Sequence, residues 1–410
     1  MPAESPLHDQ LAAELDRFER LGRRRTLRAV DAVGKRVTRD GRALLNLASN
    51  DYLGLSTHPH LREVAAAAAR DHGVGATASR LIVGHLDRHA ALEARFADFK
   101  HAEAALVLPT GYTANLAVLT ALAGPGDLVC LDKLVHASLI DAARASGAAL
   151  RAFPHLDTHK LDRLLARHRD AVDAVTDPLT GLDRPARRLV VTDSVFSMDG
   201  DTADLPALLD RCDEHDATLI VDEAHGTGVL GETGAGLAEA QSVAGRVPIT
   251  ISTASKALAG LGGIVTADRV VIDALVHRAR PLIYTTGVPP TQVAALDAAL
   301  DVLADEPERR RRLAELSTRV RGELAERGWA LPTTPHATPI LPLIVGDERA
   351  ALDLAARLEA AGIFGVAIRP PTVAPASSRV RLCLRADLTD AEVDEVLAAV
   401  GSVKQASQAP

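Results

Sequence analysis

Cysteine is scarce in this chain, which has only three cysteines among its 410 residues: Cys130, Cys212 and Cys383. None of them stands in a CxxC or CxxH spacing, so the sequence predicts neither a disulfide framework nor a structural zinc site. The sequence predicts no other metal site. So few cysteines are typical of a protein from a reducing compartment.

Long apolar runs are also missing. No window approaches the roughly 18 uninterrupted apolar residues that a membrane-spanning helix needs. The N-terminal segment MPAESPLHDQLAAELDRF lacks the apolar core that a signal peptide contains. We therefore expect a cytoplasmic protein with no membrane partner.

An excess of positive charge is absent as well, because the formal net charge is −8. This balance disfavours general binding to nucleic acid or to an anionic membrane. The segment RFERLGRRRTLR (17–28) is a local exception. It is consistent with a solvated amphipathic helix and also with an anion-binding patch, and the sequence leaves both interpretations open.

Apolar runs that predict strands alternate with amphipathic stretches that predict helices through the middle of the chain. The runs are continuous rather than alternating apolar and polar, which is typical of a mostly parallel sheet with helices on both faces. The sequence therefore predicts an α/β fold. The predicted strands lie in EAALVLPTG, DLVCLD, RRLVVTDSVFS, TLIVDEAHG and ITISTASKA.

The chain divides into four predicted parts. An N-terminal helical arm (1–45) precedes a large α/β domain (46–290). Short strands and helices then predict a small α+β domain (291–402), and the polar tail (403–410) is expected to be disordered. Within the large domain, two prolines and a glycine interrupt the periodicity at 173–188, which predicts a surface loop.

The strand in TLIVDEAHG ends in an acid and a histidine, Asp222 and His225. In an open, mostly parallel sheet, ligands bind at the carboxyl ends of the strands. These two side chains are therefore candidates for an active site. An acid at a strand end can also cap the following turn, and the position alone leaves that alternative open.

A lysine follows the next predicted strand, in STASKALAGLGG. Lys256 becomes a nucleophile if burial or a neighbouring cation lowers its pKa. Together with Asp222 it suggests pyridoxal phosphate, whose aldehyde a lysine binds and whose protonated ring nitrogen a carboxylate stabilises. A Lys256–Asp222 ion pair without a cofactor is the alternative.

Three further strand ends place polar groups at the same predicted edge of the sheet. Gly111 and Tyr112 begin a helix directly after a strand, where backbone N–H groups and the helix dipole can bind a phosphate. His136 stands at another strand-to-helix junction, where an imidazole can lie on a ring face. Ser197 follows a third strand, where its hydroxyl can hydrogen-bond a ring hydroxyl. Each feature is common on its own as a turn, a cap or a surface residue.

Seven motifs stand in a fixed order over roughly residues 40 to 400. They are SNDYLGL, GYTAN, HASLIDA, TDSVFSMDGD, VDEAHGTGVLGETG, STASKALAGLGG and LIYTTGVPP. This ordered set resembles the α-oxoamine synthases, a family of fold-type-I pyridoxal-phosphate enzymes that condense an amino acid with an acyl thioester and release carbon dioxide. Within the family, AIRPPTV (367–373) is similar to the form in the 8-amino-7-oxononanoate synthases of biotin biosynthesis.

The resemblance implies a role for each residue at the predicted sheet edge. Lys256 would bind the cofactor aldehyde and remove the α-proton of the amino acid, and Asp222 would contact the pyridine nitrogen. His136 would stack on the ring, and His225 and Ser197 would contact its hydroxyl. The implied phosphate-binding residues are Gly111, Tyr112 and Thr253.

The resemblance also implies where the substrates bind. Asn50 and Arg369 match positions near the carboxylate of the amino acid, which an arginine binds with two parallel hydrogen bonds. Arg23 matches arginines near the distal carboxylate of a dicarboxylic acyl chain, in competition with the solvated-helix interpretation. Thr372 belongs to the same implied substrate site.

A second subunit is implied as well. Thr285 and Thr286 match residues that reach the phosphate bound by the neighbouring subunit, so the resemblance implies a homodimer with shared active sites. Two segments depart from the family pattern: GATASR (75–80) and KALAGLGG (256–263) replace more polar or more flexible residues. These departures concern the surroundings of the acyl chain rather than the cofactor.

The implied reaction joins L-alanine to a pimeloyl thioester, on coenzyme A or on acyl carrier protein, and forms 8-amino-7-oxononanoate. The nearest alternative is another α-oxoamine synthase that uses glycine or serine, such as a glycine C-acetyltransferase. The IRPPT segment and the N-terminal arginines argue against it. A more distant alternative is a non-catalytic ligand sensor with the same fold, and the presence of Lys256 argues against that.

Overall fold

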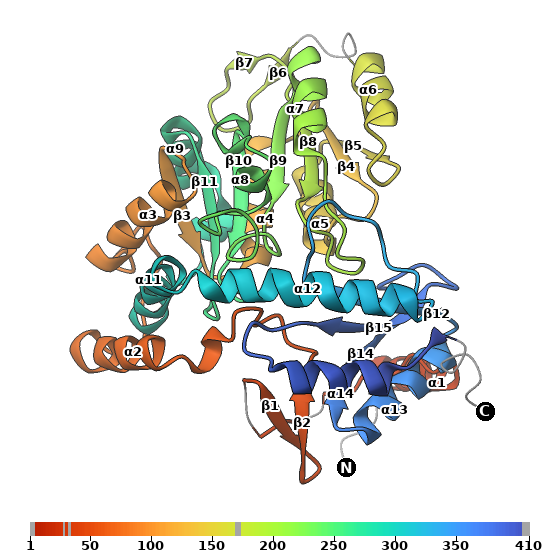
Figure 1. Ribbon diagram of the computed structural model, residues 1–410. Coiled ribbons are helices and arrows are strands. Elements are labelled where there is room, and N and C mark those ends of the chain that lie inside the picture. Colours follow the sequence, from red (N-terminus) through yellow and green to blue (C-terminus); the bar gives the residue numbers. More distant parts are fainter. Residues whose placement is uncertain (1–4, 28, 32–33, 169–173, 404–410) are drawn as a thin grey trace.

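The computed structural model describes residues 5–27, 29–31, 34–168 and 174–403. A central sheet organises them (Figure 1), with the strand order β3-β11-β10-β9-β8-β4-β5. The strands from β10 to β5 run parallel to one another, which confirms the predicted mostly parallel α/β fold. The bounds are β3 Ala104–Leu108, β4 Leu128–Asp132, β5 Ala149–Phe153, β8 Arg188–Asp193, β9 Thr218–Asp222, β10 Ile249–Thr253 and β11 Gly263–Ala267.

The strands β5 and β11 were not predicted. β11 runs antiparallel to both of its neighbours, β10 and β3. The connection from β10 to β11 (254–262) is too short for the crossover that a parallel neighbour requires, so the chain turns back as a hairpin. This hairpin loop contains Lys256, which therefore stays at the carboxyl end of β10.

Helices cover both faces of the sheet (Figure 1). The helix α4 contacts β3, β10 and β11, and it also contacts α5, α9 and α10. The helices α6 and α7 contact each other and pack against β5 and β9, respectively. The bounds are α2 Pro59–His72, α3 Asp87–Phe99, α4 Gly111–Leu122, α5 Ala137–Ser146, α6 Thr158–Arg167, α7 Leu205–Glu214, α8 Leu237–Ala240, α9 Arg269–Arg278 and α10 Arg280–Ile283, with 3₁₀ turns η1 Leu55–Thr57 and η2 Ala244–Arg246.

A smaller group of elements lies beside the sheet, and α12 runs between the two (Figure 1). It contains a three-stranded sheet, β12-β15-β14, and a second one, β1-β2-β13, in which strands from near both ends of the chain pair. The bounds are β1 Arg36–Arg39, β2 Arg42–Asn46, β12 Ile340–Gly346, β13 Ile363–Phe364, β14 Val366–Ile368, β15 Ser378–Cys383, α11 Pro290–Asp305, α12 Glu308–Glu326, α13 Glu348–Ala360 and α14 Asp390–Val400. The N-terminal strands thus pair with the C-terminal part of the chain. The predicted domain boundaries remain a prediction.

The N-terminal helix α1 (Pro6–Arg20) buries none of its side chains. The segment after it is attached to the rest of the chain by an ion pair between Arg23 and Glu348 at 2.7 Å and by a hydrogen bond from Arg369 to the carbonyl of Gly22. Across the described ranges, no helix combines the length and the apolar character needed to cross a membrane.

The predicted loop at 173–188 contains a short hairpin, β6 (Val175–Thr176) with β7 (Asp183–Arg184). Its arginine, Arg184, donates to both carboxylate oxygens of Asp127 at 2.7 and 2.6 Å. Residue 173, like the 404–410 part of the predicted disordered tail, lies outside the described residues.

A buried arginine joins the loop after β2 to the segment after β15. The side chain of Arg385 is fully buried and donates to Asp51 at 3.0 Å and to Asp387 at 2.9 Å. Asp51 also accepts a hydrogen bond from the backbone of Leu55 at 2.8 Å. These contacts fix the conformation of the SNDYLGL motif.

We expect Arg385→Leu to lower the free energy of unfolding by about 3–5 kcal/mol, because it leaves the buried carboxylate of Asp51 without its cationic partner. Urea denaturation followed by circular dichroism measures this loss. The control is Arg70→Leu, which breaks an ion pair between exposed side chains and should leave the midpoint nearly unchanged. Equal midpoints for the two variants would contradict a structural role for Arg385.

Candidate active site

The carboxyl ends of the parallel strands surround a pocket of about 210 Å³. Most of the residues predicted to bind a cofactor line it together, although they come from distant parts of the sequence. These residues are Gly111, Tyr112, His136, Asp222, His225, Thr253 and Lys256. The structure therefore brings the predicted strand-end groups into one site.

Asp222 is held in a fixed orientation at the end of β9. Its Oδ2 accepts a hydrogen bond from Asn115 Nδ2 at 2.8 Å, and its Oδ1 accepts one from the backbone of Ala224 at 2.9 Å. Asn115 is buried and its amide also donates to Ser138 at 2.8 Å. The sequence analysis did not assign Asn115 a role, although it closes the GYTAN motif one helical turn after Gly111.

A second carboxyl group, Asp193, lies beside Asp222 and was also missed. The two residues are direct partners in the parallel pairing of β8 with β9. Burial, and then the negative charge of Asp222, raise the pKa of Asp193 well above its usual value. Asp193 also accepts a hydrogen bond from the backbone of His136 at 3.3 Å. The raised pKa of Asp193 reduces the repulsion between the two neighbouring carboxyl groups.

Lys256 lies in a short chain of hydrogen bonds. Its Nζ is 2.8 Å from His225 Nε2, and Tyr52 Oη is 2.6 Å from His225 Nδ1. Burial, and then the positive charge of Lys256, lower the pKa of His225 well below its usual value. The ring is therefore neutral, with one donor and one acceptor nitrogen. Tyr52, which is fully buried, was not predicted as part of the site.

An arginine that the sequence analysis missed reaches the same chain. Arg381, in β15, donates from Nη2 to Asn50 Oδ1 at 2.7 Å, and the same Nη2 lies 3.5 Å from Tyr52 Oη. Its positive charge lowers the pKa of the lysine, after the larger effect of burial. Arg381 and the predicted Asn50 thus lie together on the side of the site formed by the smaller group of elements.

Other predicted residues lie elsewhere. Arg23, Arg369 and Thr372 line a second pocket of about 870 Å³. Its lining includes six arginines but only two acids. The arginines are Arg23, Arg24, Arg25, Arg39, Arg349 and Arg369, and the acids are Asp353 and Glu359.

A third pocket, of about 330 Å³, lies between the other two. It shares Ser255 and Lys256 with the first pocket and Val30 and Phe364 with the second. Its lining also includes Ala259, at one of the two departures from the family pattern. The three pockets are therefore neighbours with shared walls, which extend from the lysine to the arginine-rich pocket.

Ser197, Thr285 and Thr286 line none of these pockets. Ser197 is half-buried in the turn after β8. Thr286 forms an isolated β-bridge with Ser79 on the surface loop that precedes α3. The roles implied for these three residues stay predictions.

The first pocket has the groups that pyridoxal phosphate requires. An anchored carboxylate can bind a pyridinium nitrogen, and a half-buried amine can bind an aldehyde. The N-terminus of α4 can bind a phosphate. The backbone of Gly111 approaches Thr253 so closely that an added Cβ would lie 3.2 Å from the threonine Oγ1. The residues present therefore fit this cofactor.

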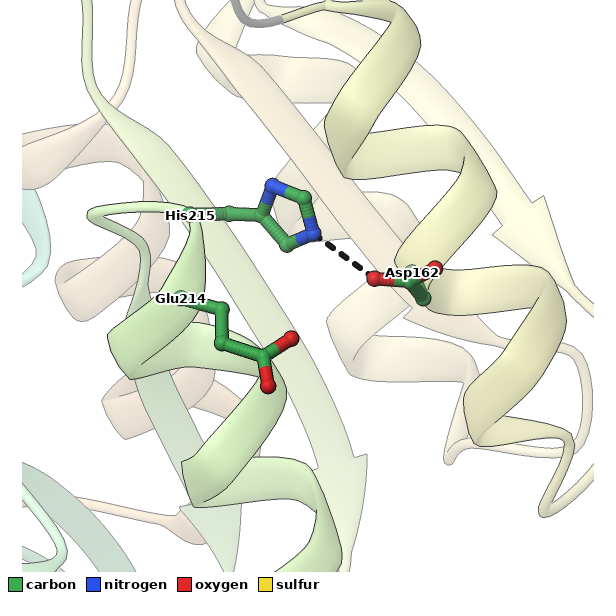
Figure 2. A group of neighbouring side chains, drawn as sticks. All are labelled: Asp162, Glu214 and His215. Atoms are coloured by element: carbon green, nitrogen blue, oxygen red, sulfur yellow. Dashed lines mark hydrogen bonds and ion pairs between the residues drawn. The ribbon is translucent and has the colours of Figure 1, made fainter.

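One group of side chains in the described part of the chain could bring three metal ligands together, although no metal site was predicted. Figure 2 shows Asp162 of α6 facing Glu214 and His215 at the end of α7, with ligand atoms within 4.8 Å of one another. Arg211 Nη1 lies 2.7 Å from Glu214 and 3.9 Å from Asp162. This cation makes the cluster an ion-pair network between two helices.

The environment of Lys256 predicts an unusual reactivity. Burial lowers the pKa of Lys256 to about 8, although Asp222 and Asp193 raise it. In the apoprotein we expect the rate of acylation of this amine to rise with a midpoint near pH 8, and the exposed Lys160 serves as an internal reference. Limited labelling followed by peptide mass spectrometry measures both rates in one sample.

Asp222→Asn should move the midpoint for Lys256 to lower pH, because the lost negative charge no longer stabilises the ammonium form. The rate at Lys160 should stay unchanged. A midpoint above pH 10 for Lys256 in the unmodified chain would contradict this description of the site.

Comparison with known proteins agrees with this geometry. Residues 42–400 match the family described as aminotransferase class I and II. The chain is 46% identical to the 8-amino-7-oxononanoate synthase of Anaeromyxobacter dehalogenans (strain 2CP-1), over 96% of this chain and 95% of that protein. It is 43% identical to the protein of the same name from Geobacter sulfurreducens, over 96% and 97% of the two chains.

A solved structure is also similar, with a TM-score of 0.87 and 28% identity over 97% of this chain and 98% of that one. It is a serine palmitoyltransferase variant from S. paucimobilis with a bound PLP–myriocin aldimine. The sequence relatives and the shared fold agree over nearly the whole length, and the chain belongs to the family of class I and II aminotransferases.

Proposed function

We propose that this chain is a pyridoxal-phosphate-dependent acyltransferase that condenses L-alanine with a pimeloyl thioester. The products are 8-amino-7-oxononanoate, carbon dioxide and a free thiol, as in biotin biosynthesis. The observation that supports this most directly is the row of neighbouring pockets that extends from Lys256 to the arginine-rich pocket. The relatives named 8-amino-7-oxononanoate synthase, at 43 to 46% identity, support the same reaction.

The cofactor, when bound, accepts the electron pair that the α-carbon of the amino acid keeps after it loses a proton. Asp222, held by Asn115, keeps the ring nitrogen protonated. His136 would stack on the ring, and His225 and Ser197 would contact its hydroxyl. The phosphate is assigned to the start of α4, with Gly111, Tyr112 and Thr253.

Lys256 is assigned the transfer of the α-proton. A general base works best when its pKa lies near the operating pH, and the pKa of about 8 meets that condition. The neutral ring of His225, 2.8 Å away, can hydrogen-bond the amine in either protonation state.

We assign the carboxylate of the amino acid to Arg381 and Asn50, rather than to Arg369 as the sequence suggested. Arg381 lies on the same chain of contacts as Lys256, whereas Arg369 lines the separate arginine-rich pocket. Arg369, Arg23 and Thr372 are then assigned to the distal carboxylate of the pimeloyl chain. The third pocket, between the two, would hold the methylene groups.

We further propose that the enzyme is a homodimer of the cytoplasm. Thr285 and Thr286 lie beside Tyr284, whose side chain is 70% exposed. Large apolar side chains are also exposed on the loop that Thr286 contacts, including Ile82 and Val83. A second copy of the chain would cover these groups and would bring the threonines to its phosphate site.

A serine-dependent reaction is the second candidate, because a serine palmitoyltransferase shares the fold at a TM-score of 0.87. The lower identity of 28%, against 46% for the first relative, favours alanine and a pimeloyl donor. The relatives named 8-amino-7-oxononanoate synthase argue against a ligand sensor without activity.

Substrate preference tests the proposal. We expect the cofactor-loaded protein to release thiol with L-alanine and pimeloyl-CoA, because the arginine-rich pocket matches a second carboxylate. Thiol release is measured with a chromogenic disulfide while alanine, glycine and serine are crossed with pimeloyl, acetyl and palmitoyl thioesters. Release with serine and palmitoyl-CoA, but not with alanine and pimeloyl-CoA, would overturn the proposed substrates.

Substitutions of Arg381 and Arg369 should change the KM values of different substrates. We expect Arg381→Lys to raise the KM for alanine by about tenfold or more, the effect of losing a charged hydrogen bond, with little change in the KM for the acyl thioester. Arg369→Lys should do the reverse. Steady-state kinetics with each substrate varied in turn measures both, and the opposite pattern would restore the assignment of Arg369 to the amino acid.

A further inference from the structure

A histidine outside the pocket is hydrogen-bonded on both sides of its ring. His155 follows β5, and its Nδ1 lies 2.9 Å from Asp132 while its Nε2 lies 2.7 Å from Asp201. Asp132 is almost completely buried and also accepts hydrogen bonds from the backbone of Leu134 and Leu156, each at 2.8 Å. An ionised carboxylate can only accept hydrogen bonds. Two such carboxylates, one at each ring nitrogen of His155, therefore require an N–H on both nitrogens, and only the imidazolium form has two N–H groups.

The surroundings of the ring favour this charged form. Phe196 packs edge-on against His155 with the ring centres 4.3 Å apart. Burial by itself lowers the pKa of His155. The hydrogen bonds to Asp132 and Asp201 together outweigh burial and raise the pKa to about 9. The positive charge of Arg321 in α12 interacts with Asp201, and its guanidinium donates to the carbonyl of Gly200 at 3.4 Å.

The three bonded residues belong to three different loops of the sheet. Asp132 ends β4 and stands four residues before His136, which lines the pocket. Asp201 ends the turn after β8 that contains Ser197. Because β4 lies between β5 and β8 in the sheet, His155 connects the loops that follow three adjacent parallel strands.

We infer that His155 is a positioning residue, which as an imidazolium fixes the loop with His136 against the turn with Ser197. It touches neither the pocket nor the reacting atoms, and it acts through the two aspartates. Its effect on the cofactor rests on the proposed function, because His136 and Ser197 are assigned to the cofactor ring. Its charge state does not depend on that proposal.

The pH dependence follows from the sign of the shift. A folded-state pKa above the unfolded value means that the charged ring stabilises the fold fully below about pH 6.5, the ordinary histidine value. This contribution is lost as the pH rises through about 9. The positioning should therefore persist at neutral pH and fail in mild alkali.

The first experiment observes the charge directly. The full chain is labelled with ¹⁵N-histidine, and the ring signals of His155 are assigned as those missing from His155→Gln. We expect both ring nitrogens to be protonated at pH 7.5, with a transition near pH 9. Asp201→Asn should move that transition to lower pH. A neutral tautomer of His155 at pH 7.5 would overturn the inference.

The second experiment measures cofactor binding to the apoprotein by fluorescence quenching with pyridoxal phosphate. We expect His155→Gln to weaken binding about tenfold at pH 7.5, which corresponds to about 1.4 kcal/mol, and the difference from the unmodified chain to shrink above pH 9. The matched control is His60→Gln, which removes a histidine that is exposed and paired with Asp301. It should bind as the unmodified chain does.

Failure of the proposed function and failure of the positioning role of His155 would give different results. If the unmodified apoprotein binds no pyridoxal phosphate, the proposed function is overturned while the ¹⁵N spectra still decide the charge of His155. If His155→Gln binds the cofactor as tightly as the unmodified chain at every pH, the positioning role is overturned while the proposed function stands.

Discussion

The carboxylate of Asp222 lies buried at the carboxyl end of β9, and the arrangement of the site depends on how that charge is accommodated. An uncompensated buried charge is costly, so it needs donors and opposite charge around it. Asn115 and the backbone of Ala224 supply the donors, and the raised pKa of Asp193 reduces the repulsion from the neighbouring carboxyl group. Lys256 contributes the opposite charge, and its own pKa is a compromise between burial and the two aspartates. A ring nitrogen that needs a permanent anion is the natural ligand of such a position.

The site also depends on contact between the large sheet and the smaller group of elements. Lys256 and His225 follow strands of the sheet, whereas Arg381 belongs to β15 and Tyr52 belongs to the loop held by Arg385. The hydrogen bonds from Lys256 through His225 to Tyr52 cross from one group to the other. Stability and chemistry are therefore linked, because a shift between the two groups would alter the surroundings of the lysine.

The sequence predicted those residues of the site that stand at the ends of predicted strands. Continuous apolar runs mark buried parallel strands, and Asp222, Lys256 and His136 stand at their ends or within four residues of them. Arg381 could not be found in this way, because it stands inside a strand whose partners, β12 and β14, are set by long-range pairing. Asp193 was missed because its importance comes from its register with β9. The strand β11 was missed because a short hairpin, and not a helix, precedes it.

The arginine-rich pocket bears on which acyl chain the site can accept. A guanidinium that is packed against hydrocarbon loses its hydration without gaining a hydrogen-bond partner, which is unfavourable. A long apolar chain that ended beside Arg369 would impose that cost, whereas a chain ending in a carboxylate would offer this guanidinium a bidentate partner. Even with Glu348 paired to Arg23, the six arginines outnumber the acids around the pocket, which retains positive charge for such a ligand. Under the proposed function the two arginine sites would serve different substrates, since a dicarboxylic acyl chain and an amino acid each bring a carboxylate of their own.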